Sequence, residues 1–189
     1  MTKDELRSIV QQRIHTLSSE EITLQSEHVV KSIIHTKQYK EAQAVLAYVA
    51  LHDEINLSSL FDYLQQGDKR LFLPKVESDG IIQFYEAGTK WDQNLIVNKY
   101  HILEPPHTSS LYSESDFNST LIIVPAVAYD VEKRRLGRGG GYYDRYLGNS
   151  KSHAFALGVC FDIQLVDHLP TLDHDQRVDA IISYETSLW

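Results

Sequence analysis

The sequence has one cysteine, few glycines and prolines, and no long hydrophobic run. These scarcities exclude several kinds of structure and site. Cys160 cannot form an internal disulfide, and it has no second cysteine for a paired-cysteine zinc site. It lies in FALGVCF, which is typical of a buried strand, so we expect a small core residue rather than a nucleophile. No apolar run approaches the roughly 18 residues of a membrane span, and the N-terminus is charged. We therefore expect a cytoplasmic protein without a membrane partner.

Positive charge is also scarce, because the chain has 18 lysines and arginines but 26 aspartates and glutamates, which gives a net charge of -8. Such a chain is a poor partner for nucleic acid or an anionic membrane, because that binding depends on neutralising phosphates. Basic residues nevertheless cluster in one short segment: Lys133, Arg134, Arg135, Arg138 and Arg145. A local positive cluster on an acidic chain indicates a small polyanion as ligand, with phosphate as the obvious candidate.

The composition is otherwise that of a soluble globular protein, with 42% hydrophobic and 23% charged residues. A length of 189 residues suits one hydrophobic core, since domains usually hold roughly 100 to 200 residues. We expect a single domain over residues 1–189 that acts as a monomer.

Hydrophobic periodicity predicts two N-terminal helices, over residues 3–16 and 19–37. Ser18 and Glu21 have the spacing of a capping box, in which each side chain bonds the backbone N–H of the other residue. The second helix should therefore begin directly after Ser18.

A strand, a helix and another strand are predicted next, over residues 44–51, 56–67 and 70–76. Asn56 is expected to cap the helix at its N-terminus, and Gly67 to end it. Two strands joined through a helix pair in parallel, so this order predicts a parallel sheet.

The remaining strands are predicted over residues 81–87, 120–130, 153–161 and 179–185. The turn signal SDG before the first of them indicates a hairpin or a meander at one edge of the sheet. The fold class is therefore α/β, with a mostly parallel sheet.

The segment RRLGRGGGYYDRYL, residues 134–147, is poor material for a hydrophobic core. It follows a predicted strand and leads toward a possible helix, so its glycines would expose backbone N–H groups to an anion. The usual nucleotide motifs are absent: no Lys-Ser or Lys-Thr follows the glycines, and Tyr142 stands where a dinucleotide fingerprint has its third glycine. The segment is another kind of phosphate loop or, alternatively, a flexible turn.

His52, Asp53 and Glu54 follow the predicted strand 44–51. Ligands of open α/β sheets bind outside the carboxyl ends of the strands, where these carboxylates could grip an amidine-like pair of donors. A solvated turn is the competing interpretation. The signatures of zinc proteases and serine hydrolases, HExxH and GxSxG, are missing.

The stretch VPAVAYDVEKRRLGRGGGYYDRYL, residues 124–147, resembles the signature of the 5-formyltetrahydrofolate cyclo-ligase family, also called methenyltetrahydrofolate synthetase. Three further matches follow the expected order: KDELR at 3–7, HDEI at 52–55 and HILEPP at 101–106. The resemblance spans nearly the whole chain, and RLGRGGGYYD is far more specific than a lone glycine motif.

The resemblance implies a three-layer α/β fold with helices flanking the sheet. It also implies ATP-dependent conversion of 5-formyltetrahydrofolate to 5,10-methenyltetrahydrofolate, with release of ADP and phosphate and with Mg²⁺ as cofactor. Arg135, Arg138 and Tyr142 become the candidate catalytic residues, and Asp144 the candidate magnesium contact.

The same resemblance implies two overlapping sets of binding residues. Those for ATP are Lys3, Arg7, Arg135, Leu136, Gly137, Arg138, Gly139, Gly140, Gly141, Tyr142 and Tyr143. Those for the folate are Glu54, Arg138, Gly139, Gly140, Gly141 and Tyr142. One loop that contacts both substrates is reasonable, because a phosphoryl group must pass between them.

Three positions depart from the family pattern, because Lys133, His101 and Ala126 stand where glycine is commoner in the family. Lys133 stands where the family usually has glycine, so the turn before Arg135 must change conformation or accept strain.

Two other functions remain open from the residues themselves. A non-catalytic sensor could bind a nucleotide or sugar phosphate through the same loop. A sugar-phosphate isomerase on a related fold is the third possibility, and it should turn over without ATP.

Overall fold

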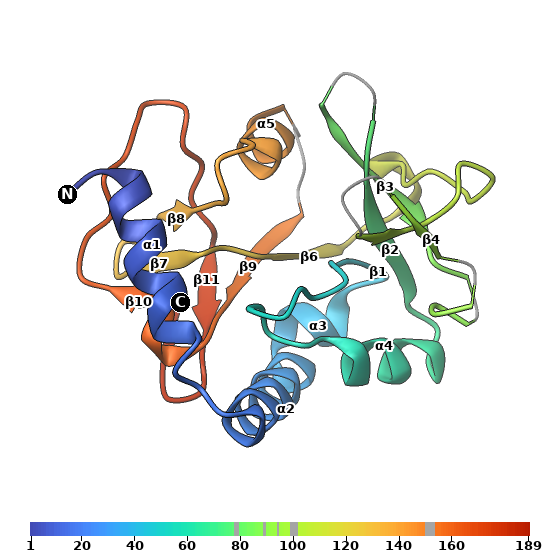
Figure 1. The fold of residues 1–189 in the computed structure, drawn as a ribbon. Helices are drawn as coiled ribbons and strands as arrows, with labels where there is room; N and C mark the ends of the chain where they lie inside the picture. The colour runs from blue at the N-terminus through green and yellow to red at the C-terminus, as the bar shows by residue number, and fades with distance from the viewer. Residues whose placement is uncertain (78–79, 89, 94, 99–101, 150–153) are drawn as a thin grey trace.

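A seven-stranded sheet forms the centre of the protein, in a computed structural model that describes residues 1–77, 80–88, 90–93, 95–98, 102–149 and 154–189 (Figure 1). In spatial order the strands are β12 (Ser187–Leu188), β11 (Ala180–Ile182), β9 (Phe155–Val159), β6 (Thr120–Val124), β1 (Ala44–Leu46), β2 (Arg70–Val76) and β3 (Ile82–Glu86). The inner strands pair in parallel, whereas the edge strands β3 and β12 are antiparallel to their neighbours. The predicted α/β class, the parallel β1–β2 pair and the edge hairpin are confirmed.

Helices and two smaller sheets surround the central sheet. The α-helices are α1 (Lys3–Ile14), α2 (Ser19–His35), α3 (Lys37–Glu41), α4 (Ser58–Gln65) and α5 (Tyr142–Asn149), and the 3₁₀ helices are η1 (Glu114–Asp116) and η2 (Asp162–Gln164). One small sheet contains β10 (Leu165–Val166), β7 (Ala128–Asp130) and β8 (Arg135–Leu136), and the other contains β4 (Ile96–Val97) and β5 (Leu103–Glu104).

The sheet buries both of its faces, as alternation along β6 illustrates. Leu121 and Ile123 join a core cluster that also contains residues of α1, α2 and α4. Ile122 and Val124 point the other way, into a second cluster against which aromatic residues of α5 pack. The protein therefore has three layers, with the sheet between two sets of helices, as the resemblance implied.

The predicted strand over residues 120–130 is wrong in one respect, because it is two strands in different sheets. β6 ends at Val124, and β7 begins at Ala128 in the small sheet. Pro125 lies between them and has no N–H to donate to a sheet ladder, which explains why the long apolar run cannot continue as one strand. This break turns the chain away from the sheet immediately before the glycine segment.

The boundaries of the early elements differ in smaller ways. The Ser18 and Glu21 capping box is present, but β1 covers only part of the predicted strand 44–51. Leu57, rather than Asn56, occupies the N-cap position of α4, although Asn56 Oδ1 accepts a hydrogen bond from the Ser58 backbone N–H at 2.9 Å. The first residues of two predicted stretches, His101 of HILEPP and His153 of the strand 153–161, lie outside the described residues.

The turn between β7 and β8 accepts strain at Lys133, which has a φ of 63° in the left-handed region. The buried Asp130 carboxylate stabilises this turn, since its Oδ1 accepts hydrogen bonds from the backbone N–H groups of Glu132 and Arg134, each at 3.0 Å. Lys133 Nζ donates to the Asp179 carbonyl oxygen at 2.9 Å. Of the two outcomes expected for a lysine in place of glycine, the structure has the strained one.

A close approach inside the second core cluster explains why β9 contains Gly158. A Cβ atom at this position would lie 2.7 Å from two ring atoms of the buried Tyr129 side chain, whose hydroxyl donates to the Val124 carbonyl oxygen. We expect Gly158→Ala to lower the free energy of unfolding by about 1 to 3 kcal/mol, as overpacking of a core usually does. Urea unfolding measures the loss.

Gly148 provides the matched control for that substitution. A Cβ atom there would make only ordinary contacts with the Gln176 side chain, the nearest at 3.6 Å, and the residue is helical. Gly148→Ala should therefore leave stability unchanged or raise it by up to about 1 kcal/mol. Equal effects of the two substitutions would contradict this account of the Gly158 contact.

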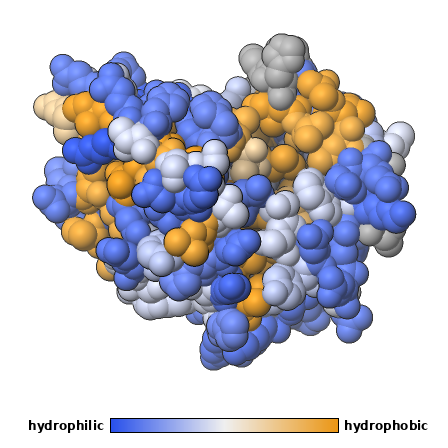
Figure 2. Space-filling view, turned by 60° about the horizontal axis from the view of Figure 1, so that its bottom comes forward, coloured by the Kyte–Doolittle hydropathy of each residue, from blue (hydrophilic) through white to orange (hydrophobic). Residues whose placement is uncertain are grey.

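In the part of the chain that the structure describes, no helix is long and apolar enough to cross a membrane. Figure 2 shows a mainly hydrophilic face with its broadest hydrophobic group at the upper right and smaller hydrophobic groups on the left and in the centre.

Candidate active site

A pocket of about 410 Å³ lies beyond the carboxyl ends of the central strands. Residues that follow β1 and β6, the last residue of β2 and the glycine segment after β8 all line it. This is the edge at which α/β sheets bind ligands, because the chain leaves successive parallel strands there in loops.

The pocket brings together all the residues that the resemblance assigned to ATP, folate or metal. These are Lys3, Arg7, Glu54, Arg135, Leu136, Gly137, Arg138, Gly139, Gly140, Gly141, Tyr142, Tyr143 and Asp144. Their shared location is compatible with the assigned roles, which remain predictions.

The glycine segment adopts a backbone that side chains would obstruct. Gly139 and Gly141 have φ values of 103° and 65°, in the region that glycine alone adopts without strain. A Cβ atom on Gly140 would lie 2.5 Å from the Tyr142 ring. Since α5 begins at Tyr142, the loop ends at a helix N-terminus, where backbone N–H groups are available to an anion.

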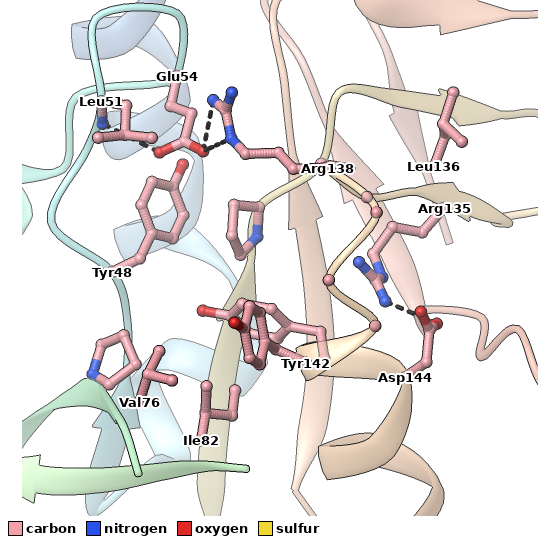
Figure 3. Close-up of a pocket in the computed structure, with 18 of the residues that line it drawn as sticks. Tyr48, Leu51, Glu54, Val76, Ile82, Arg135, Leu136, Arg138, Tyr142 and Asp144 are labelled. Carbon is pink, nitrogen blue, oxygen red and sulfur yellow. Dashed lines mark hydrogen bonds and ion pairs between the residues drawn. The ribbon is translucent and has the colours of Figure 1, made fainter. Parts of the chain in front are cut away.

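Arg135 is the most buried cation of the segment, with 3% of its side chain exposed. Its Nη2 donates to Asp144 Oδ1 at 2.6 Å, as Figure 3 shows, and its guanidinium lies over the Tyr143 ring at 5.7 Å. Arg135 Nε and the Tyr143 hydroxyl are buried, and neither has a hydrogen-bond partner among the described residues. Burial raises the pKa of Tyr143, so its hydroxyl stays protonated and can donate. The pair therefore offers two unused donors beside the pocket.

Helix α1 brings Lys3 and Arg7 to the same pocket from the far end of the sequence. Lys3 Nζ contacts Asp175 Oδ2 at 2.5 Å, and Arg7 Nε donates to the Gly137 carbonyl oxygen at 2.8 Å. The two residues are four positions apart, which is about one helical turn, so both lie on the side of α1 that faces the glycine segment. Hydrogen bonds from Lys3 and the Leu172 N–H outweigh the effect of burial and lower the pKa of Asp175.

Arg138 extends to two carboxylates that follow β1, those of Asp53 and Glu54, and Figure 3 shows its contact with Glu54. Its Nη2 lies 2.6 Å from Asp53 Oδ1 and 3.0 Å from Glu54 Oε1, and its Nε lies 3.3 Å from the same Glu54 oxygen. Glu54 Oε2 accepts from the Leu51 backbone N–H at 3.0 Å. Burial lowers the pKa of Arg138, but these contacts outweigh that effect, and the net shift is upward.

The segment presents less positive charge to the pocket than its sequence predicts. Arg135 and Arg138 line it, whereas Lys133, Arg134 and Arg145 do not. Arg134 contacts Glu132 at 2.5 Å, and Arg145 donates to the Gly80 carbonyl oxygen at 2.6 Å. Proximity in sequence therefore did not mean proximity to the ligand site.

His52 is exposed and outside the pocket lining, where its ring stacks on His15 with the centroids 6.0 Å apart. The interpretation as a solvated turn is therefore the better one for His52, although its neighbour Glu54 lines the pocket. Cys160 is fully buried, as expected for a core residue, and burial raises its pKa.

Two features of the pocket were not predicted. Asp175 lines it near Lys3, and no local motif marks that residue in the sequence. Glu104, which the family match contained, forms a buried ion pair with Lys75 at 2.6 Å. Alternation along β2 could have identified Lys75, because a lysine among buried strand positions usually has a carboxylate partner.

A magnesium ion fits this site only as a companion of nucleotide phosphates. Among the described residues, no group of three or more His, Cys, Asp or Glu side chains could hold a metal. Asp144 Oδ1 is occupied by Arg135 Nη2 and by the Gln176 N–H at 3.1 Å, while Oδ2 accepts no hydrogen bond from the described residues. Magnesium commonly binds one or two carboxylates together with substrate phosphates and water, and this donor set satisfies that pattern.

The fold is that of an α/β protein with a parallel sheet. The glycine loop at the carboxyl edge of the sheet and the cations around the pocket are features typical of a site that binds phosphate groups. Residues 1–184 match the 5-formyltetrahydrofolate cyclo-ligase family. The chain belongs to that family.

Relatives from distant organisms agree with this assignment. The chain is 32% identical over 143 residues to the 5-formyltetrahydrofolate cyclo-ligase of Mycolicibacterium smegmatis, covering 75% of this chain and 73% of that protein. It is 27% identical over 190 residues to the mouse protein of the same name, covering 96% and 93%. The solved structure of Aquifex aeolicus 5,10-methenyltetrahydrofolate synthetase is 32% identical, with a TM-score of 0.85, and the match covers 100% of this chain and 92% of that one.

Proposed function

We propose that the protein is an ATP-dependent ligase that converts 5-formyltetrahydrofolate to 5,10-methenyltetrahydrofolate, with release of ADP and phosphate. The observation that carries the proposal is the pocket in which the family signature, the N-terminal helix and the HDEI stretch converge. The net charge of -8 supports the further expectation that nucleic acid and anionic membranes are not partners. We take residues 1–189 to act as one domain and as a monomer.

ATP is proposed to lie with its phosphates against the glycine loop, between Arg135 and the two cations of α1. Lys3 and Arg7 then provide charge from one side, and the backbone N–H groups of the loop provide hydrogen bonds from the other. Lys3 is paired with Asp175, and Arg135 with Asp144. Phosphate binding must therefore compete with Asp175 for Lys3, whereas Arg135 can donate from Nε and keep its contact with Asp144.

The folate is proposed to place its pterin ring near Glu54. A carboxylate accepts two hydrogen bonds from a ring N–H and an adjacent amino group, as it does from a guanidinium. In the structure Glu54 Oε1 accepts both hydrogen bonds from the Arg138 guanidinium, which supports a role for Glu54 as an acceptor of paired donors. The Arg138 side chain extends from the glycine loop toward Glu54, across the region where the two substrates would meet.

The reaction needs ATP because a formyl group on N5 is an amide and a poor electrophile. In the proposed first step, the formyl oxygen bonds to the γ-phosphorus while the bond from that phosphorus to ADP breaks. N10 then bonds to the activated carbon and releases its proton, and the carbon–oxygen bond to phosphate breaks to leave the methenyl bridge. Alignment and charge stabilisation by Arg135, Arg138 and the loop N–H groups suffice, with Tyr142 packed against the loop, and no protein nucleophile is required.

Asp144 is proposed to hold the magnesium ion that accompanies ATP, directly or through water. The ion would supply additional neutralisation of the phosphate charge. Arg135 keeps Asp144 oriented through the contact at Oδ1, which leaves Oδ2 as the oxygen that would face the ion.

We expect Asp144→Asn to raise the magnesium concentration needed for half-maximal activity by about tenfold or more, since a neutral amide is a poor magnesium ligand. The amide oxygen can still accept the hydrogen bonds of Arg135 and the Gln176 N–H, so the melting temperature should fall only modestly. Titration of magnesium at saturating ATP and folate, beside a melting curve, gives both values. An unchanged magnesium midpoint together with a large loss of stability would assign Asp144 a purely structural role.

Incubation with 5-formyltetrahydrofolate, ATP and magnesium tests the proposed function. The methenyl chromophore should appear only when ATP is present. Binding of ATP without any chromophore would favour the non-catalytic sensor, and sugar-phosphate turnover without ATP would favour the isomerase.

A further inference from the structure

The proposed site assigns no role to Asp53. Its side chain is 6% exposed and does not line the pocket, so it is not placed to contact a substrate. It nevertheless makes the shortest contact of the Arg138 guanidinium, at 2.6 Å from Nη2. Arg138 thus has one carboxylate partner behind the pocket wall, Asp53, and one that lines the pocket, Glu54.

The hydrogen-bonding capacity of Glu54 limits what it can do while Arg138 is bound. A carboxylate oxygen has two lone pairs, and Glu54 Oε1 accepts from both Nε and Nη2 of Arg138. Oε2 accepts from the Leu51 N–H and has one lone pair left. A donor pair from a pterin needs both oxygens, so Arg138 must release Oε1 before the ring can bind in that way.

The distances indicate which contact is released. Arg138 lies 3.0 and 3.3 Å from Glu54 Oε1, against 2.6 Å from Asp53 Oδ1. Charge-assisted hydrogen bonds weaken as they lengthen beyond about 2.9 Å, so the contacts with Glu54 are the weaker ones. Release of Glu54 alone would leave Arg138 charged, paired and still beside the glycine loop.

We propose that Asp53 is a positioning residue that retains Arg138 when Glu54 is transferred from the guanidinium to the incoming pterin. The proposal rests on the proposed function, because it presumes that Glu54 receives the folate. Two carboxylates in succession, one buried and one in the pocket, are required for this exchange. Without Asp53, Glu54 would be the only carboxylate partner of Arg138 among the described residues, and the folate would have to displace it completely.

The test is a binding measurement on Asp53→Asn, which keeps the size and an acceptor oxygen but removes the charge. We expect the Kd for 5-formyltetrahydrofolate to rise about tenfold, and the Kd for ATP to change by less than about twofold. In an Arg138→Ala background, Asp53→Asn should change the folate Kd by less than about twofold, because no guanidinium remains to be held. Calorimetry on the four proteins of this cycle provides the values.

Two further variants keep the result interpretable. Asp62→Asn, at an exposed position of α4, is the matched control and should leave both Kd values unchanged. If Asp53→Asn does not fold, Asp53→Ser replaces it in the same cycle.

Two outcomes would overturn the proposal and make Asp53 a merely structural residue. One is an equal increase of the folate Kd with and without the Arg138 side chain, and the other is no increase of the folate Kd in either background. If the wild-type protein binds no 5-formyltetrahydrofolate, the proposed function fails first, and the role of Asp53 fails with it.

Discussion

Replacement of Arg135 by alanine is expected to lower kcat about thousandfold, because an arginine that stabilises a phosphoryl transition state contributes at least that much. Arg135 is not a surface arginine, since only 3% of its side chain is exposed. Single-turnover kinetics with saturating ATP and folate measure the loss. A folded Arg135→Ala protein with nearly wild-type kcat would contradict the catalytic assignment.

The burial of Arg135 also determines how that experiment is controlled. Removal of one partner from a buried ion pair costs about 3 kcal/mol or more, so Arg135→Ala is expected to lose stability as well as activity. Arg135→Lys keeps the charge beside Asp144 but lacks the planar fork, and we expect kcat to fall about a hundredfold with the fold intact. Arg134→Lys is the matched control at the adjacent position outside the pocket, and it should leave kcat unchanged.

Glu54→Gln is expected to raise the Kd for 5-formyltetrahydrofolate by about 10- to 100-fold while the Kd for ATP stays within about twofold. Glutamine keeps the shape of the side chain, but its amide nitrogen presents donors where the carboxylate accepted, and the charge is lost. Calorimetric titration of each substrate separates the two affinities.

Glu132→Gln is the control for that titration, because Glu132 is an exposed carboxylate outside the pocket. It should alter neither affinity. If Glu54→Gln weakened ATP and folate equally, Glu54 would have a general structural role, acting on the pocket through the Leu51 N–H and Arg138.

The sheet was predictable because its signals are local. Apolar runs with flanking turn residues identify the strands, and the capping box at Ser18 fixes the start of α2. The division at Pro125 could also have been anticipated, since proline cannot donate within a ladder. Neither the pairing of β7 with β8 nor the left-handed Lys133 follows from local propensity alone, because the Asp130 carboxylate stabilises that turn.

The candidate site was predictable only in part. The resemblance indicated which residues to expect together, and the structure places them around one pocket. The resemblance gave no indication that the pocket cations would be paired with carboxylates, as Lys3 is with Asp175 and Arg138 with Asp53. These pairs join segments more than 80 residues apart, and only the tertiary fold brings them together.

The measurement that tests the central claim most directly follows the formyl oxygen. Substrate labelled with ¹⁸O in the formyl group is converted with unlabelled ATP and magnesium, and the phosphate and ADP are analysed by mass spectrometry. If the formyl oxygen attacks the γ-phosphorus, each methenyl product should be accompanied by one ADP and one phosphate that carries the label. Unlabelled phosphate with the label in water, or methenyl product formed without ADP, would contradict phosphoryl transfer in this pocket.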